Sequence, residues 1–189
     1  MTTFPNWFDG QKYNFEKYLK PFKDKPNLKF LQLGVYTGDA SVWLCDNILT
    51  GEGSVLRDVD TWQGSDEREH ENIDFNQVFD TYITRTYGKP KCHYEMTTNE
   101  FFYNTKFGKY DFIYIDANHT ADAVASDADN AWKVLKSKGI MAFDDYMWGQ
   151  DLPPHLTPRP AIDAFLEKHE GMYNLLTKEY QVWIQKNDN

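Results

Sequence analysis

The chain has 189 residues, a formal net charge of −9, and 41% hydrophobic and 16% aromatic residues. This length predicts a single domain over residues 1–189. The apolar fraction is typical of a folded protein and disfavours extended disorder. The acidic balance argues against nucleic-acid partners, which require a basic face, but it suits a small cationic ligand or a divalent metal.

The cysteines and the N-terminus bear on the cellular compartment. Cys45 and Cys92 are the only two cysteines, which is too few for a disulfide framework, so we expect reduced thiols. The N-terminus lacks the basic start and apolar core of a signal peptide. No run approaches the roughly 18 apolar residues of a membrane span. We therefore expect no membrane association and a cytoplasmic location.

Residues 1–27 are aromatic-rich, and they predict a short helix capped by Asn14 that carries Phe15 and Leu19 on one face. This helical segment either packs on the edge of a sheet or acts as a lid over a cleft. Residues 29–35 then predict the first strand, followed by a turn with Gly34 and Gly38 and by a helix. Glycine permits a tight turn and close approach of a ligand, although many such turns are purely structural. The Gly-x-x-x-Gly spacing differs from the dinucleotide fingerprint.

Residues 54–60 predict a second strand that ends at Asp60. An acid at this point is where a nucleoside-binding unit contacts its ribose. Asp58 competes for that role but lies farther from the strand end. Residues 65–71 are highly charged and predict a solvated loop or a flap, and a helix is expected around residues 75–83.

Residues 91–186 predict further strands, two of which end at acidic residues. Residues 91–96 form a third strand, and residues 109–116 form a fourth that ends at Asp116, with His119 three positions later. A helix from Thr120, closed by residues 136–139, leads to a fifth strand that ends before Asp144 and Asp145. A helix at residues 161–169 and strands at 174–178 and 180–186 complete the prediction.

This alternation of strands and helices indicates an α/β fold with a mainly parallel sheet. Ligands of such sheets bind beyond the carboxyl ends of the strands, where the strand order reverses. If the reversal lies between the first and fourth strands, then Gly34, Asp60, Asp116 and Asp144 border one cleft. The other histidines show no ligand spacing: His70, His93, His155 and His169.

Three segments carry a resemblance to a known family: residues 30–41 (FLQLGVYTGDAS), 59–64 (VDTWQG) and 111–119 (DFIYIDANH). Further matches are residues 132–139 (WKVLKSKG), 143–146 (FDDY) and 160–165 (PAIDAF). Together they resemble class I S-adenosylmethionine-dependent methyltransferases, in particular the small-molecule O-methyltransferase branch that includes macrocin and catechol O-methyltransferases. The resemblance covers about residues 28–186. The motifs in this order are specific for the family, whereas any single motif is not.

The resemblance implies a single Rossmann-like, doubly wound sheet of seven strands, mostly parallel, with an antiparallel last strand and helices on both faces. It implies S-adenosylmethionine as cofactor, with Gly34, Tyr36, Gly38 and Ser41 around its methionine part, Asp60 on the ribose, and Thr97 and Thr98 beside the adenine. Asp116 would border the cofactor and, with Asp144 and Asp145, hold Mg²⁺, while His119 matches the base of the macrocin-type enzymes. Trp62 and Trp148 either wall the pockets or serve packing.

The predicted function is metal-assisted O-methylation of a small hydroxylated molecule. The alternatives are a metal-independent N- or O-methyltransferase and a non-catalytic cofactor-binding module, since fold does not fix function. One departure from the family is Gln32, where an acid is frequent, and it predicts a weaker contact with the cofactor's amino group. The sequence leaves open the methyl acceptor and whether the chain is a homo-oligomer.

Overall fold

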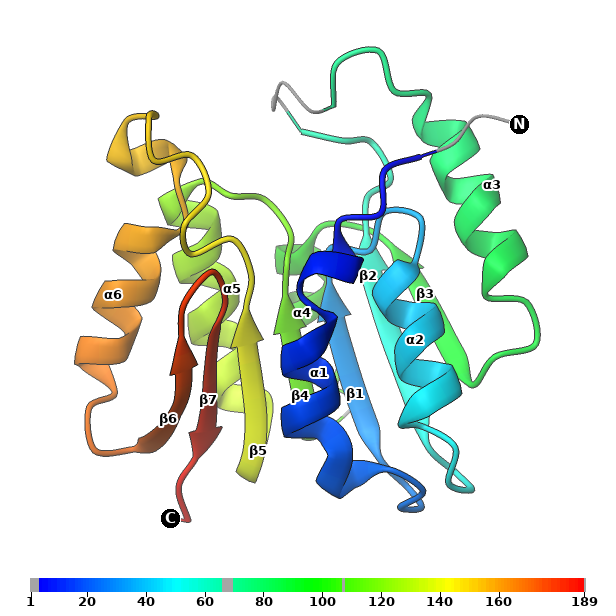
Figure 1. Cartoon of the computed structure of the whole chain (residues 1–189), viewed down its shortest axis with the longest axis horizontal. Helices are drawn as coiled ribbons and strands as arrows, with labels where there is room; N and C mark the ends of the chain where they lie inside the picture. Colours follow the sequence, from blue (N-terminus) through cyan, green and yellow to red (C-terminus); the bar gives the residue numbers. More distant parts are fainter. Residues whose placement is uncertain (1–3, 66–69, 107, 189) are drawn as a thin grey trace.

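A computed structural model of the chain describes residues 4–65, 70–106 and 108–188, and these form a seven-stranded sheet with helices on both faces (Figure 1). The strand order is β3-β2-β1-β4-β5-β7-β6. Neighbours from β3 to β5 are parallel, whereas β7 is antiparallel to both β5 and β6. The strands are β1 (Lys29–Leu33), β2 (Val55–Asp60), β3 (Lys91–Glu95), β4 (Tyr110–Ile115), β5 (Leu135–Phe143), β6 (Tyr173–Lys178) and β7 (Val182–Lys186). This topology confirms the predicted fold class and places the reversal of strand order between β1 and β4.

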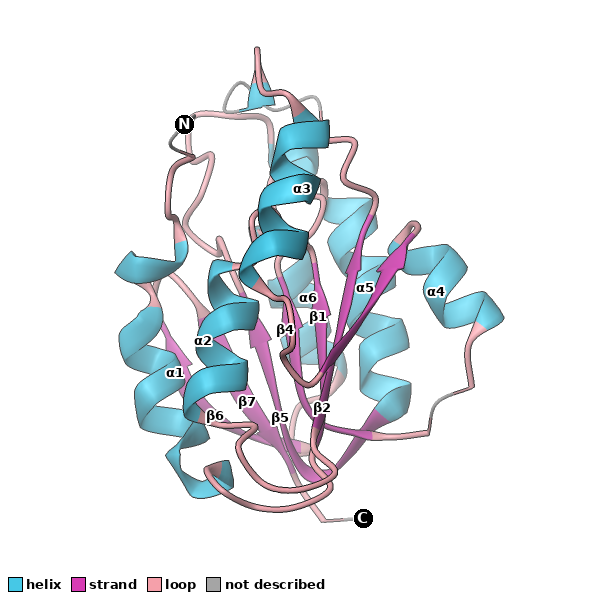
Figure 2. Ribbon diagram, turned by 90° about the vertical axis from the view of Figure 1, so that its right-hand side faces the viewer, coloured by secondary structure: helices cyan, strands magenta, loops and turns pink. Residues whose placement is uncertain are grey.

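The helices form two layers on opposite faces of the sheet (Figure 2). One hydrophobic cluster joins α1 and α2 to one face, and another joins α4, α5 and α6 to the other. The central strands supply both clusters in alternation: Phe30 and Phe112 belong to the first, and Leu31 and Ile113 to the second. The α-helices are α1 (Lys12–Leu19), α2 (Asp39–Asn47), α3 (Phe75–Arg85), α4 (Thr98–Asn104), α5 (Ala121–Val134) and α6 (Arg159–Lys168).

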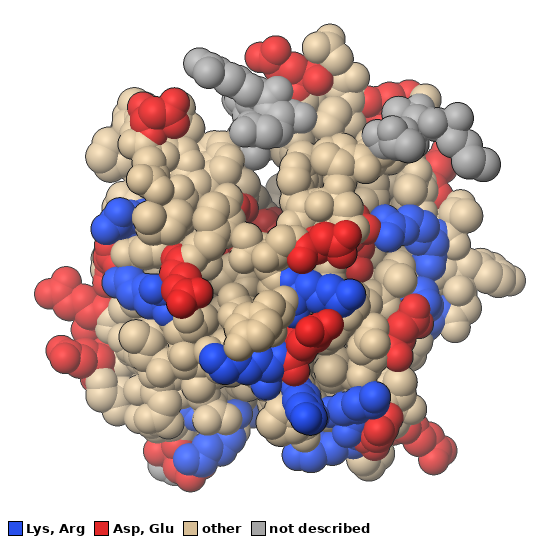
Figure 3. All heavy atoms as spheres, viewed as in Figure 1, with Lys and Arg blue, Asp and Glu red and all other residues tan. Residues whose placement is uncertain are grey.

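Three short 3₁₀ turns accompany these helices among the described residues: η1 (Phe8–Gly10), η2 (Lys20–Phe22) and η4 (Pro154–Leu156). No helix in the described ranges has both the length and the apolar character needed to cross a bilayer. Most of the charged segment predicted as a loop or flap, residues 66–69, lies outside the described residues. The surface viewed in Figure 3 intersperses basic and acidic side chains, and a hollow near its top has acidic atoms at its bottom.

The N-terminal helix differs from its prediction in one respect. Asn14 lies inside α1 and does not cap it, because the helix already begins at Lys12. Its buried amide donates to Gln181 Oε1 at 3.0 Å and so ties α1 to the residue before β7. Phe15 packs edge-to-face against Tyr114 and Trp183, with ring centroids 4.9 Å apart in each case. The helix therefore packs against a face of the sheet, whereas the packing alternative placed it on the edge of the sheet.

Two local features differ from the sequence prediction. Helix α4 was not predicted, although Thr97 and Glu100 form a capping box in which each side chain accepts from the other's backbone N–H. The helix expected to close at residues 136–139 instead ends at Val134, and β5 begins at Leu135. The buried side of α5 consists of Val124, Asp127, Ala128 and Ala131. Asp127 is the one charged residue of this set, and it lines the cleft described below.

Candidate active site

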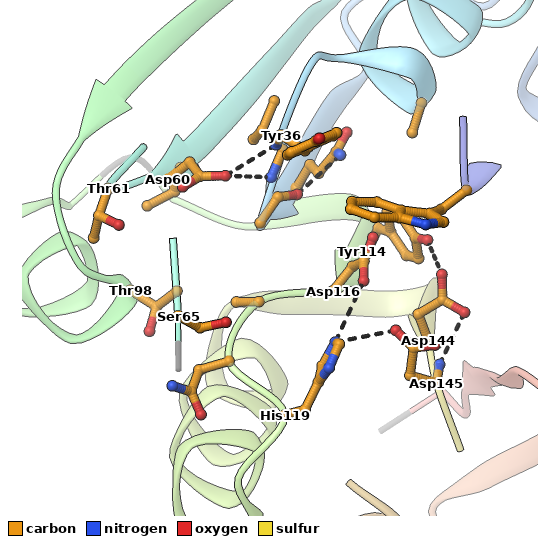
Figure 4. A pocket seen from close by; sticks show the side chains of 18 of the residues that line it. Tyr36, Asp60, Thr61, Ser65, Thr98, Tyr114, Asp116, His119, Asp144 and Asp145 are labelled. Atoms are coloured by element: carbon orange, nitrogen blue, oxygen red, sulfur yellow. Dashed lines mark hydrogen bonds and ion pairs between the residues drawn. The ribbon is translucent and has the colours of Figure 1, made fainter. Parts of the chain in front are cut away.

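A cavity of about 600 Å³ lies beyond the carboxyl ends of β1, β2, β4 and β5. This is where a parallel α/β sheet places its ligand, and the volume lies within the range of small-molecule sites. Seven of the predicted cofactor residues line it: Gly34, Tyr36, Asp60, Trp62, Thr97, Thr98 and Asp116. His119, Asp144 and Asp145 line it as well. Sequence positions spread over more than half of the chain thus meet in one cleft (Figure 4).

Gly38 and Ser41 do not line the cavity. Gly38 precedes α2 with a φ of +78°, and a Cβ there would lie 2.7 Å from the Tyr82 ring. Ser41 is fully buried and donates to Gln32 Oε1 at 3.3 Å. These two residues therefore support the turn between β1 and α2 from outside the cavity. Glycine is required at position 38 because a larger residue would clash with Tyr82, and not because a ligand approaches the backbone there.

The backbone at Gly34 also lies too close to a neighbouring segment to allow a side chain. Its φ is +82°, and a Cβ at this position would lie 1.7 Å from the backbone oxygen of Asp116. The close approach that requires glycine is therefore between the end of β1 and the end of β4. Gly34 allows the cofactor side and the acidic side of the cleft to be adjacent.

Asp60 holds the loop after β1 through its carboxylate. Oδ2 accepts from the backbone N–H groups of Val35 and Tyr36 at 2.7 and 3.0 Å, and Oδ1 accepts from that of Trp62 at 2.8 Å. Hydrogen bonds to a carboxylate are among the stronger ones in proteins. The acid predicted to contact a ribose is thus also the residue that shapes the loop.

Asp58, the competing acid on β2, faces away from the cleft. It is fully buried, and its Oδ2 accepts from the Tyr82 hydroxyl at 2.8 Å. Burial raises the pKa of Asp58 to about 7, and the hydrogen bond from Tyr82 opposes this shift. The structure therefore favours Asp60 over Asp58 as the cleft residue.

The aromatic residues around the cofactor side combine wall and packing roles. Trp62 is buried, packs on Tyr82 at 4.8 Å between ring centroids, and donates its Nε1 hydrogen to Tyr36 O at 3.0 Å. Tyr36 contacts Trp7 of the N-terminal segment at 4.6 Å between ring centroids. Trp7 itself lines the cavity, so the N-terminal segment contributes a wall of the cleft as well as covering the sheet. Sequence reasoning did not assign Trp7 to the site.

At the other end of the cleft, Asp116, His119 and Asp145 offer ligand atoms that all lie within 4.8 Å of one another. His119 Nε2 lies 3.0 Å from Asp145 Oδ2 and 3.9 Å from Asp116 Oδ1. The imidazole also packs against Trp148, with ring centroids 4.7 Å apart. Figure 4 shows His119 pointing toward both acids from the loop that precedes α5.

Asp144 has its own partners. Oδ2 accepts from the hydroxyl of Tyr114, which is buried in β4, and Oδ1 accepts from the backbone N–H of Asp145 at 2.9 Å. Asp145 adopts a left-handed conformation with φ of +56°, because the chain has turned beyond the end of β5. This turn lets two adjacent acids line the same cavity, which the alternation of an extended strand would prevent. Tyr180, from the β6–β7 turn, donates to Asp145 Oδ1 at 2.9 Å.

The crowding of acids at this end changes their ionisation. Burial, together with the nearby charge of Asp145, raises the pKa of Asp116 to about 6, against the hydrogen bond from His119. Burial and the charges of Asp116 and Asp145 raise the pKa of Asp144 well above its usual range. Shifts of this kind are common where carboxylates serve a cation or a proton transfer. Sequence reasoning missed both Tyr114 and Tyr180. Tyr114 is buried in β4 and so looks like any core residue in the sequence, whereas Tyr180 lies in the β6–β7 turn, remote in sequence from Asp145.

Comparisons with known proteins agree with this geometry. Residues 31–146 match the family described as "Methyltransferase domain". No curated protein is similar enough in sequence to count as a relative. Among solved structures, a protein from Clostridium thermocellum assigned as an rRNA methylase has a TM-score of 0.69 at 13% identity, and the match covers 100% of this chain and 99% of that one.

Two O-methyltransferases are also similar in fold. The enzyme from Bacillus cereus, solved with SAH, has a TM-score of 0.68 at 13% identity, over 99% of this chain and 84% of its own. TomG from Streptomyces achromogenes, solved with SAM, has a TM-score of 0.63 at 14% identity, over 85% and 73%. At such identities these likenesses establish the fold. The matching segment covers more than half of the chain, so the chain belongs to the methyltransferase-domain family and is an S-adenosylmethionine-dependent methyltransferase.

Proposed function

We propose that this chain is a divalent-metal-assisted O-methyltransferase that acts on a small hydroxylated molecule. The observation that carries the proposal is the convergence of Asp116, His119 and Asp145 within 4.8 Å at one end of the cleft. Two carboxylates beside an imidazole can serve both a cation and the removal of a hydroxyl proton. O-methyltransferases among the structural neighbours support the choice of acceptor atom.

The cofactor would occupy the side of the cleft between β1 and β2. Gly34 and Tyr36 would border its methionine part, Asp60 its ribose, and Trp62, Thr97 and Thr98 its adenine; Asp116 would flank it. Gly38 and Ser41 would act indirectly, by supporting the turn and Gln32. Gln32 donates from Nε2 to Gly34 O at 3.0 Å and accepts from Ser41, so its amide is already engaged within the protein. The positive sulfonium would be attracted by the acids at the far end.

The donor set fits a hard cation such as Mg²⁺, which prefers carboxylate oxygens to imidazole nitrogen. Asp116, Asp144 and Asp145 would hold it. The raised pKa values of Asp116 and Asp144 mean that burial and the charges of neighbouring acids outweigh the stabilising contacts of these carboxyl groups, including the one with His119. A divalent cation would supply a compensating positive charge. His119 is then left for proton transfer, although its Nε2 lies close enough to serve as a ligand.

When bound, S-adenosylmethionine would supply a methyl group on a sulfonium, and the cation would lower the pKa of the acceptor hydroxyl. His119 would accept the hydroxyl proton. Asp145, 3.0 Å away, would stabilise the resulting imidazolium. Tyr180 and Tyr114 would keep Asp145 and Asp144 in place through their hydroxyl groups. Trp148, against the imidazole, would restrict the access of water.

A second function, metal-independent methyl transfer, is favoured by one contact. The 3.0 Å pair of His119 and Asp145 resembles the acid-oriented histidine that acts as a base without a metal. In that case Asp145 would orient the imidazole, and no cation would be needed.

Calorimetry and a transfer assay separate these functions. Titrations with S-adenosylmethionine and with Mg²⁺ measure binding, and transfer of a radiolabelled methyl group to a panel of catechols and sugars measures activity. We expect His119→Ala to keep Mg²⁺ affinity and to lose about 100-fold or more in transfer rate. Asp145→Asn should lower Mg²⁺ affinity by at least about 10-fold.

The outcomes discriminate as follows. Failure of the wild type to bind S-adenosylmethionine would exclude both functions. Activity that is unaffected by chelators and by added Mg²⁺ would support the metal-independent reaction. Loss of Mg²⁺ affinity in His119→Ala would make His119 a metal ligand and remove its assignment as the base.

A further inference from the structure

A buried acid on α5 has no role in the chemistry described above. Asp127 is only 2% exposed, yet it lines the cleft. Its Oδ1 has no hydrogen-bond partner among the residues that the structure describes. Its neighbours on the buried side of α5 are Val124, Ala128 and Ala131. An apolar residue would suit this helix face better than a carboxylate.

The local environment does little to compensate this carboxylate. Burial raises the pKa of Asp127 to about 6, and a hydrogen bond with the Thr98 side chain opposes the shift only in part. Buried polar atoms in native proteins are nearly always paired, so an unpaired oxygen that borders a cavity calls for a ligand that donates a hydrogen bond. The Thr98 contact orients the carboxyl group, and Oδ1 is left without a hydrogen-bond partner among the described residues in a side chain that lines the cleft.

The position of Asp127 indicates which part of a ligand it would meet. Met96, Thr98 and Ala123 line the cavity with it. In Figure 4, Thr98 lies on the same side of the cavity as Asp60 and Thr61, and away from Asp144 and Asp145. A cofactor with its ribose at Asp60 and its methyl group near the acids would therefore direct its base toward Thr98 and Asp127. Met96 and Ala123 offer apolar contacts to a flat ring.

We propose that Asp127 accepts a hydrogen bond from the exocyclic amino group of the cofactor's adenine and thereby selects adenine over bases that carry a carbonyl group at that position. This inference rests on the proposed placement of S-adenosylmethionine. Thr98 is the positioning residue, since its side chain forms a hydrogen bond with the Asp127 carboxyl group. A carbonyl in place of the amino group would face the Asp127 oxygen and be repelled, because both groups are acceptors.

The test compares two product-like ligands, S-adenosylhomocysteine and its deaminated analogue S-inosylhomocysteine, in which a carbonyl replaces the amino group and the neighbouring ring N1 gains a hydrogen. Calorimetry on the wild type should show a preference for the adenosyl ligand of about 10- to 100-fold. In Asp127→Asn the new N–H₂ can donate to the inosyl carbonyl, so the preference should fall by about 10-fold or more. Asp122→Asn is the matched control, because Asp122 is an exposed acid on the same helix, and its preference should equal that of the wild type.

Each outcome has a distinct meaning. A wild type that binds neither ligand would overturn the proposed function itself. Adenosyl binding with the same preference in wild type and Asp127→Asn would overturn the role of Asp127 alone. Thermal melts identify a variant that fails to fold. If Asp127→Asn fails to fold, the same two ligands are titrated into Asp127→Ala. Its preference for the adenosyl ligand should also fall, because loss of the acceptor weakens adenosyl binding and leaves inosyl binding unchanged or stronger.

Discussion

The two ends of the cleft differ in how their acids are partnered. At the β2 end, the Asp60 carboxylate accepts three backbone N–H groups and holds the loop that carries Tyr36. At the β4–β5 end, Asp116 and Asp144 lie half-buried beside Asp145, and both have raised pKa values. One end is complete within the protein, whereas at the other end burial and the mutual repulsion of the acids outweigh their contacts with His119. This contrast indicates that the first end is a preformed binding surface and that the second suits a cation and a proton transfer.

The largest effect is expected where the two ends meet. Gly34→Ala would place a Cβ 1.7 Å from Asp116 O at a φ of +82°. The clash forces β1 and β4 apart, so we expect a loss of more than about 4 kcal/mol in the free energy of unfolding. Denaturant titration measures this loss. Gly88→Ala is the control, since Gly88 has a φ of +74° and a Cβ added there would meet nothing within 4 Å; it should cost only about 1 kcal/mol. Equal losses in the two variants would contradict the contact.

The pH dependence of stability extends the comparison to Asp127. Its pKa is about 6 in the native state against an ordinary value of 3.8, so between these values the native protein binds the proton more tightly than the unfolded chain. Rising pH therefore destabilises the native state across this window, by about 3 kcal/mol in total, with the full penalty present above pH 6. Relative to the wild type, Asp127→Asn should gain stability between about pH 4 and 7. A pH-independent difference in urea titrations would refute this.

A smaller effect is expected from the complete end of the cleft. Asp60→Asn turns one acceptor oxygen into a donor that faces backbone N–H groups, so the loop after β1 loses its support. We expect affinity for S-adenosylmethionine to fall about 10- to 100-fold, with Mg²⁺ affinity unchanged. Glu95→Gln is the control, because Glu95 is an exposed acid that pairs with Asp60 in the β2–β3 register. If calorimetry finds the same affinity for S-adenosylmethionine in both variants, Asp60 does not contribute to cofactor binding.

The smallest effect is expected from the tyrosine that orients the second end. Tyr180→Phe removes the hydroxyl that donates to Asp145 at 2.9 Å and keeps the ring. We expect Mg²⁺ affinity to fall about 10-fold, because an outer residue orients a ligand. Tyr103→Phe, at a side chain that is 88% exposed, should change nothing. An unchanged affinity in Tyr180→Phe would show that Asp145 needs no orientation.

Much of the fold was predictable because it depends on short-range patterns. Apolar runs that end at Asp60, Asp116 and Asp144 identify buried strands and place these acids at one edge of the sheet. The missed helix α4 had a signal in its capping box of Thr97 and Glu100, which pattern reading overlooked. In contrast, Asn14 was misassigned as a cap because its true partner, Gln181, is remote in sequence.

Local sequence patterns specified the succession of strands and helices, the family, and four of the acids that line the cleft, namely Asp60, Asp116, Asp144 and Asp145. The role of each acid emerged only from the folded arrangement, since hydrogen-bond partners from other elements set its orientation and its pKa. The fold paired Asp144 with Tyr114, turned Asp145 toward His119, and left Oδ1 of Asp127 without a hydrogen-bond partner among the described residues. The physical reason is that burial and charge depend on neighbours in space, and a local pattern does not encode those neighbours.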